Sequence, residues 1–144
     1  MTRTFKGEPS FVLFPLGKKR FALPAGVVTE LARPDRLRSF PHTTRMLAGV
    51  LLRRGQIVPV CDIAPVLVGE DAAPRKFFLI ANRYFGNTRE WTAIPVSGEC
   101  ELASTELLPV TGKLPRYVIG LLSLADEIVQ VLDLGLLHAA EATA

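Results

Sequence analysis

The sequence predicts an all-β fold made of two small β-barrels that pack together, with short helical pieces between strands. Three observations predict this fold. Short apolar runs recur along the whole chain, the eleven glycines and eleven prolines fall mostly between them, and one apolar hairpin pattern occurs twice. The chain has 144 residues, of which 49% are hydrophobic, so it can bury one or two small cores without disulfides or metals.

The apolar runs are rich in Val, Ile, Leu and Phe, a composition typical of strands. Gly, Pro and charged pairs end each run, because these residues favour turns and oppose long helices. We therefore predict ten strands, at residues 10–14, 20–23, 27–32, 49–52, 56–61, 76–81, 91–96, 107–110, 117–124 and 128–132. Helical pieces are expected at residues 43–48, after Asp62, and from Asp133 towards Ala140.

The repeated hairpin appears when the chain is aligned with itself at an offset of 71 residues. Residues 46–66 then lie without gaps over residues 117–137, and six of the 21 positions are identical. In both copies an apolar strand meets a tight turn, returns as a second strand and ends at an aspartate. The repeat predicts two barrels of similar design, each closed so that its strand edges are hidden.

Asp62 and Asp133 end the two copies of the hairpin. A carboxylate at this position accepts unpaired N–H groups of a following helix, so both residues are predicted to be helix caps rather than a catalytic pair. His42 and His138 are predicted to have surface or packing roles. Cys61 and Cys100 are predicted to be buried free thiols.

Catalytic and metal-binding motifs are not found in the sequence. It has no glycine-rich phosphate loop, no HExxH, no CxxC and no Gly-x-Ser-x-Gly. We therefore predict no enzyme activity, no catalytic residue, no metal and no cofactor. The longest apolar run, residues 117–125, is too short for a membrane span, and the first residues do not resemble a secretory signal. These features predict a cytoplasmic protein without membrane insertion.

Positive and negative charges concentrate in different parts of the chain. Residues 1–89 hold 15 Lys and Arg against 6 Asp and Glu, whereas residues 90–144 hold 2 against 8, so +9 and −6 give the net +3. A basic half could bind nucleic acid, and a nucleic-acid-binding small β-barrel is the alternative function. The strongly acidic second half favours docking to charged protein partners instead. Among the basic residues, Arg54 stands out, because it lies in a tight turn before Gly55 and is either displayed there or bonded to a carboxylate.

The stretch LAGVLLRRGQIVPVCDI at residues 47–63 resembles the signature of the CheW-like family of chemotaxis coupling proteins, Gly-Val-x-x-x-Arg-Gly-x-x-x-Pro-x-x-Asp-Leu. Upstream, RFALP at 20–24 and VVTEL at 27–31 are similar to the family's first strands. Downstream, IGL at 119–121 and VQVLDL at 129–134 are similar to its closing hairpin. The resemblance covers residues 10–138, which predicts one CheW-like domain between flexible ends at residues 1–9 and 139–144.

This resemblance implies a fold of two five-stranded, SH3-like β-barrels with a groove between them, and a non-catalytic adaptor. The implied partners are the signalling tip of chemoreceptors, the methyl-accepting chemotaxis proteins, and the regulatory domain of a CheA-type histidine kinase. The chain would then work at receptor arrays on the inner face of the membrane, in chemotaxis or in pilus-based motility. No nucleic acid is expected as a partner on this interpretation.

The resemblance also implies a partner-binding site at Glu30, Gly49, Val50, Arg54 and Gly55. An ion pair between Glu30 and Arg54 is a further hypothesis. The chain departs from the family pattern in two places. Arg53 adds an arginine before the Arg-Gly pair, and Pro95 stands where relatives carry an aspartate, which removes a ladder donor from that strand.

Overall fold

The computed structural model describes residues 8–33, 46–69, 76–85 and 87–142, which form two five-stranded sheets. In the first sheet the strand order is β8-β1-β2-β10-β9. In the second it is β3-β6-β7-β5-β4, as predicted for two barrels of similar design. The strands of the first sheet are β1 (Ser10–Leu16), β2 (Lys19–Pro24), β8 (Glu101–Ser104), β9 (Val118–Leu124) and β10 (Glu127–Leu132). Those of the second are β3 (Val28–Ala32), β4 (Leu47–Arg53), β5 (Gln56–Cys61), β6 (Phe77–Phe85) and β7 (Thr88–Val96).

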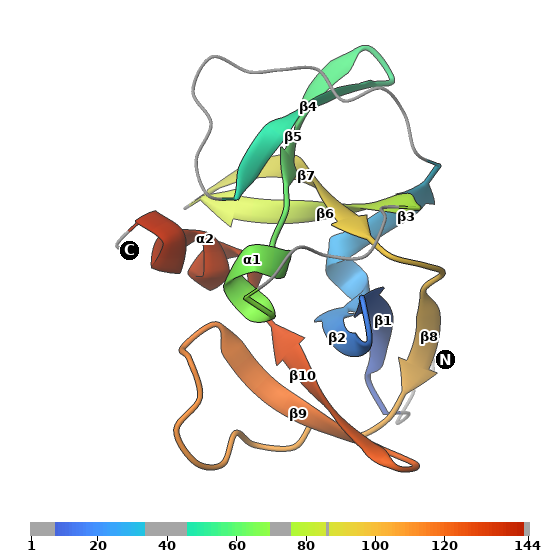
Figure 1. The fold of residues 1–144 in the computed structure, drawn as a ribbon, viewed down its shortest axis with the longest axis vertical. Coiled ribbons are helices and arrows are strands. Elements are labelled where there is room, and N and C mark those ends of the chain that lie inside the picture. The colour runs from blue at the N-terminus through green and yellow to red at the C-terminus, as the bar shows by residue number, and fades with distance from the viewer. Residues whose placement is uncertain (1–7, 34–45, 70–75, 86, 143–144) are drawn as a thin grey trace, which may run out of the picture.

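The chain passes from one barrel to the other and back (Figure 1). It forms β1 and β2 of the first sheet, then all five strands of the second, and then returns to add β8, β9 and β10 to the first. We call the first sheet barrel 1 and the second barrel 2. The short helix η1 (Ala25–Val27) leads into barrel 2, while α1 (Ala64–Leu67) and α2 (Leu134–Ala142) lie beside the junction of the barrels (Figure 1).

The two copies of the repeated hairpin, β4–β5 and β9–β10, share one register. Leu51 pairs with Val58 in the first, and Leu122 pairs with Val129 in the second, each 71 residues later. Each hairpin also has one register shift in its ladder, and the shifts fall at equivalent residues, Ala48 just before Gly49 and Ile119 just before Gly120. The similarity seen in the sequence is therefore a structural repeat.

Both hairpins end as the sequence predicts. The N–H of Ala64 donates a hydrogen bond of 3.3 Å to Oδ1 of Asp62, and the N–H of Leu136 donates one of 2.9 Å to Oδ1 of Asp133. Asp133 directly precedes α2 and caps it as expected, whereas Asp62 lies one residue before Ile63, the N-cap residue of α1, and bonds the first N–H of that short helix from there.

Barrel 1 closes where the segment after β8 meets β9. Leu108 and Leu121 exchange backbone hydrogen bonds of 2.8 and 3.0 Å there. Gly120 makes the approach possible, because a Cβ at this position would lie 2.4 Å from Cδ1 of Leu107 and 3.1 Å from the carbonyl oxygen of Leu108.

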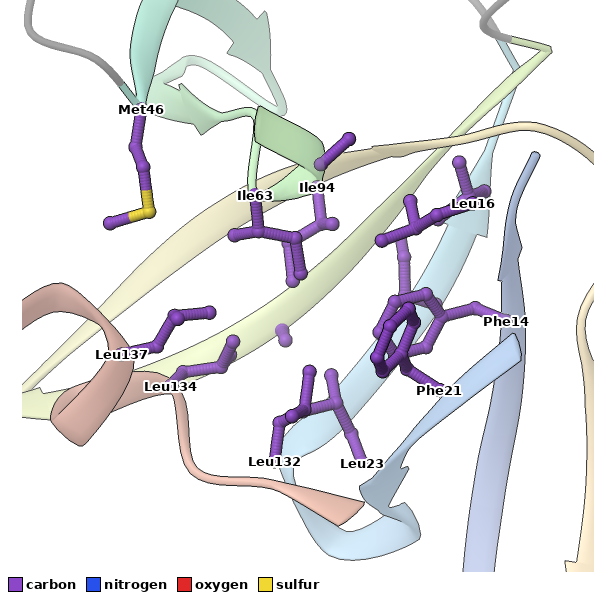
Figure 2. Packing of buried hydrophobic residues seen from close by; sticks show 14 of the residues in the cluster. Phe14, Leu16, Phe21, Leu23, Met46, Ile63, Ile94, Leu132, Leu134 and Leu137 are labelled. Carbon is purple, nitrogen blue, oxygen red and sulfur yellow. The ribbon is translucent and has the colours of Figure 1, made fainter. Parts of the chain in front are cut away.

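The largest apolar cluster lies between the barrels rather than inside either one (Figure 2). Phe14, Phe21 and Leu23 from barrel 1 point towards Ile94 and Ile63 from barrel 2. Alternation along the strands explains this arrangement, since Ile80 faces the core of barrel 2 and its neighbour Leu79 faces the shared cluster. Strands buried on both faces explain the positive mean hydropathy of +0.28.

Most predicted strands are confirmed within a few residues, but two expectations are wrong. Residues 107–110 are not a strand and contribute the single bridge at Leu108, whereas Glu101–Ser104 form β8. The helical piece expected at 43–48 is contradicted where it is described, because Leu47 begins β4. The structure does not describe His42, residues 43–45 or most of the expected flexible ends. Of the expected C-terminal end, α2 includes the residues up to Ala142.

Pro95 is buried in β7, where it pairs with Phe78 of β6. On its other side, β7 pairs with β5 at Val60 and Ala93. Pro95 lies beyond this ladder position, so the described β5–β7 pairing does not need the hydrogen-bond donor that proline lacks.

Candidate partner-binding site

The turn between β4 and β5 projects from the end of barrel 2. Its two central residues, Arg54 and Gly55, have φ values of +52° and +76°. Two successive positive φ angles define the turn type that matches the twist of a two-residue hairpin, and glycine adopts this conformation without strain. Arg54 is held in a conformation that non-glycine residues rarely adopt, and its side chain is 69% exposed.

Glu30 on β3 bonds both arginines of this turn. Nη2 of Arg53 lies 2.5 Å from Oε1 of Glu30, and Nε of Arg53 donates a second bond of 3.3 Å to Oε2. Nη2 of Arg54 lies farther away, at 3.6 Å from Oε1. The ion pair expected between Glu30 and Arg54 is present, but Arg53 is the closer partner.

The Glu30–Arg53 pair joins the two edge strands of barrel 2, β3 and β4. Alternation places Glu30 on the same side of β3 as buried Ala32, and Arg53 on the same side of β4 as buried Leu51. The pair therefore closes the end of the barrel over its core. Hydrogen bonding to Arg53 lowers the pKa of Glu30 below its ordinary value, with a smaller contribution from the charge of Arg54.

Three large apolar side chains are exposed beside this ion pair, and we call them the tip patch: Leu31, Leu52 and Ile57. Leu31 follows Glu30 on β3, so it points to the outer face. Leu52 precedes Arg53 on β4 and pairs with Ile57 on β5. Ile57 is 71% exposed. Apolar side chains around a charged turn are typical of protein-binding surfaces.

The structure brings together three of the five residues predicted for this site. Glu30, Arg54 and Gly55 lie at the end of barrel 2. Gly49 is buried further along β4, opposite Val60, and half-buried Val50 lies opposite Pro59. Sequence reasoning missed the role of Arg53. The alternation of side chains along β4 could have indicated this role, because Leu51 faces the core and Arg53, two residues later, lies on the same face of the strand.

A groove of about 230 Å³ lies between the barrels, on the side where α2 begins. Leu23, Val27 and Leu134 line its apolar part, and exposed Tyr84 and Ile119 stand at its edge. Oδ1 of Asn82, which also lines the groove, is buried and has no hydrogen-bond partner among the described residues. The groove therefore offers apolar walls to a partner.

The described histidine and both cysteines are at least partly buried. Nη1 of Arg83, a buried residue, lies 3.2 Å from Nδ1 of His138, which gives this histidine the packing role expected of it. Cys61 is a buried free thiol as predicted, and Cys100 is half-buried. Burial raises the pKa of Cys100 to about 11. Among the described residues, no group of three His, Cys, Asp or Glu side chains could hold a metal ion, and no helix is long and apolar enough to span a bilayer.

Comparison with protein-family models matches residues 10–142 to the CheW-like domain. The chain belongs to the CheW-like family. Its members are non-catalytic scaffold proteins of chemotaxis, so this CheW-like chain is a scaffold rather than an enzyme. Comparison with curated protein sequences gives no match.

A crystal structure of the scaffolding protein TtCheW from Thermoanaerobacter tengcongensis resembles the CheW-like chain over almost its whole length. The two structures superpose with a TM-score of 0.81 at 18% sequence identity, over 95% of this chain and 92% of the other. At this identity the similarity establishes the fold, which is the pair of five-stranded SH3-like barrels that the sequence predicts.

Proposed function

We propose that this CheW-like chain is an adaptor that couples chemoreceptors to a CheA-type histidine kinase. One observation carries the proposal: an apolar groove between the barrels and exposed apolar side chains around the charged turn of barrel 2 lie at separate places on one body with a shared core. A scaffold that links two proteins needs two such surfaces. Docking on receptors would place the chain in arrays at the inner face of the membrane.

The groove suits the helical tip of a receptor. An amphipathic helix binds by laying apolar side chains into an apolar groove, and Leu23, Val27 and Ile119 provide such walls.

The end of barrel 2 suits the regulatory domain of the kinase. The tip patch provides the apolar centre of an interface, and Arg54 and Gly55 provide its polar edge. Glu30 would position this edge by holding the turn, while Gly49 and Val50 would contribute by shaping β4 behind it.

Binding experiments with two fragments from the same organism test this function: a receptor signalling tip and a kinase regulatory domain. Both should bind the wild-type chain. Ile119→Asp introduces a charge at the groove and should weaken receptor binding about tenfold or more, because it desolvates a carboxylate in an apolar contact.

Val110→Asp is the matched control, because Val110 is exposed to a similar extent, 37% against 39%, and does not line the groove. This control should bind both fragments as the wild type does. If the wild-type chain binds neither fragment, the proposed function is wrong.

A further inference from the structure

Helix α2 covers one side of the junction between the barrels and packs against β6 of barrel 2. Leu134 and Leu137 point from the helix into the shared apolar cluster, and Leu137 is only 1% exposed (Figure 2). Leu134 and Gly135 also line the groove, together with Tyr84 of β6. The position of α2 therefore sets the shape of this side of the groove.

A polar contact lies at the same interface, one residue after Leu137. Nη1 of Arg83 on β6 lies 3.2 Å from Nδ1 of His138 on α2. The side chain of Arg83 is 8% exposed, and its Nη1 also lies 3.8 Å from Sγ of Cys61. Its Nη2 lies 3.6 Å from Oε1 of Glu90 on β7. Arg83 is thus held by strands of barrel 2, and His138 meets it when α2 is seated on β6.

The chemistry of arginine fixes the state of this histidine. A guanidinium carries N–H donors and no acceptor, so the ring nitrogen that faces Arg83 must accept the hydrogen bond. Nδ1 of His138 is therefore unprotonated, and the neutral ring carries its proton on Nε2. A second proton would bind at Nδ1. It would replace the acceptor by a donor and bring two positive charges to the distance of a hydrogen bond.

The charged and titratable groups on the strands around His138 do not remove this repulsion. Cys61 of β5 and Arg83 of β6 line the same small cavity as His138. Glu90 of β7 contacts Arg83 through Nη2, on the atom that does not face the histidine, and its side chain is 49% exposed. Water therefore screens the carboxylate of Glu90, while Arg83 stays in direct contact with the imidazole.

Three acidic residues lie on the segments around α2. The carboxylate of Asp133, just before α2, accepts the N–H of Leu136, and that of Asp62, after β5, accepts the N–H of Ala64. Both are engaged at helix starts. Glu141 follows His138 by one turn on α2, so a variant at this position belongs in the test.

Proton uptake by His138 is therefore coupled to the seating of α2. An unconstrained histidine titrates near pH ~6.5. Arg83 opposes the charged ring when α2 is seated, whereas a released helix turns the ring to water and loses this repulsion. Because the released state binds the proton more tightly, the seating is complete above pH ~6.5 and is lost progressively as the pH falls below it.

We propose that His138 and Arg83 form a pH-sensitive latch, in which the neutral histidine holds α2 on β6 and proton uptake releases the helix and opens one side of the groove. The latch goes beyond the adaptor role, because it is a property of the chain alone. Its effect on a bound receptor rests on the proposed function.

Hydrogen exchange of backbone amides from pH 8 to pH 5, corrected for the intrinsic exchange rate, tests the latch. Protection of the α2 amides should fall about tenfold or more over this range, since one proton binds the released state in preference. The amides of β9 and β10 should stay more strongly protected than those of α2 at every pH. Equal protection would show that the chain opens only as a whole, and the inference would be wrong.

His138→Asn is the decisive variant, because the asparagine oxygen can accept the bond from Arg83 and cannot take up a proton in this range. Protection of α2 in this variant should depend little on pH. Arg83→Met removes the opposing charge and should also keep α2 seated in acid. His42→Asn is the matched control, since it replaces the other histidine of the chain, and it should respond to pH as wild type does.

Two results of these exchange measurements would overturn the latch. One is a wild-type pH response in His138→Asn, which decides the matter even where Arg83→Met does not fold. The other is a response that Glu141→Gln abolishes and His138→Asn retains, because the carboxylate of Glu141 would then be the titrating group.

Binding of a receptor tip fragment at pH 8 and pH 5.5 tests the link between the latch and the groove. The affinity of wild type should fall severalfold more than that of His138→Asn between these pH values. If exchange differs between the two chains and this ratio does not, α2 does not control the groove and that part of the inference is wrong. A wild-type chain that binds no receptor fragment at either pH overturns the proposed function, while the exchange measurements still decide the latch.

Discussion

At the scale of single residues, the carboxylate of Glu30 does two things. It bonds the turn arginines, and it closes the end of barrel 2 over the apolar core. The side chains of Glu30 and Arg53 are 22% and 33% exposed, so water screens the pair only in part. Such a pair contributes up to about 1 kcal/mol to stability.

The lowered pKa of Glu30 predicts how this contribution depends on pH. Because the folded state favours the ionised carboxylate, the contribution is present above the unfolded pKa of about 4.3 and is lost as the pH falls through the folded value. Glu30→Gln should therefore be less stable than wild type at pH 7, by up to about 1 kcal/mol, and this difference should shrink as the pH falls below the unfolded pKa. Urea unfolding at several pH values measures this. A difference that stays constant with pH would contradict the ion pair.

The raised pKa of Cys100 predicts its reactivity. Only the thiolate is nucleophilic, and a pKa of about 11 keeps the thiol protonated at pH 8. Alkylation of the native chain at pH 8 should therefore be much slower than that of a free cysteine peptide, and unfolding in urea should remove the difference. Mass spectrometry follows the labelling. Labelling of native Cys100 at the rate of the peptide would show that the side chain is not desolvated.

At the scale of elements, Gly120 decides how barrel 1 closes. A methyl group there would meet the side chain of Leu107 and the backbone of Leu108, whose bonds to Leu121 close the barrel. Gly120→Ala should destabilise the chain by about 1–3 kcal/mol, because overpacking forces the segment outward. Gly26→Ala is the control, since a Cβ at Gly26 has no neighbour within 4 Å and its φ is not positive. Thermal unfolding that is the same for both variants would show that the closure tolerates a side chain.

Elements that bury alternate or continuous apolar residues could be predicted from the sequence, and the repeat gave the pairing of the two hairpins. Strand β8 could not, because Glu101 and Ser104 are polar and Leu102 is exposed on an edge strand, so burial leaves no pattern there. Leu107, Leu108 and Val110 look like a strand, but Pro109 removes a donor and only Leu108 forms a bridge.

Only the part of the candidate site that is local in sequence could be predicted. The signature pointed to Arg54 and Gly55, whose turn is local in sequence. The choice of Arg53 as the closer partner of Glu30 depends on which face of β4 enters the barrel, and that face is set by packing of Leu51 against distant strands.

At the scale of the molecule, the barrels share one core and are joined by two crossings of the chain, and so should unfold together. Leu51 and Leu122 are equivalent residues in the cores of the two barrels. Leu51→Ala and Leu122→Ala should each cost about 2–5 kcal/mol. Both should shift one common transition in urea, followed by fluorescence and circular dichroism. Two separate transitions, each moved by one variant, would show that the barrels are independent.

The shared core also supports the proposed role as an adaptor, since one body presents the groove and the end of barrel 2 at separate places. The most direct test is sedimentation of the chain with a receptor tip fragment and a kinase regulatory domain together. The account predicts a ternary complex in which all three proteins sediment as one species, and in which Ile119→Asp releases only the receptor fragment. Binding of one partner that displaces the other would contradict it.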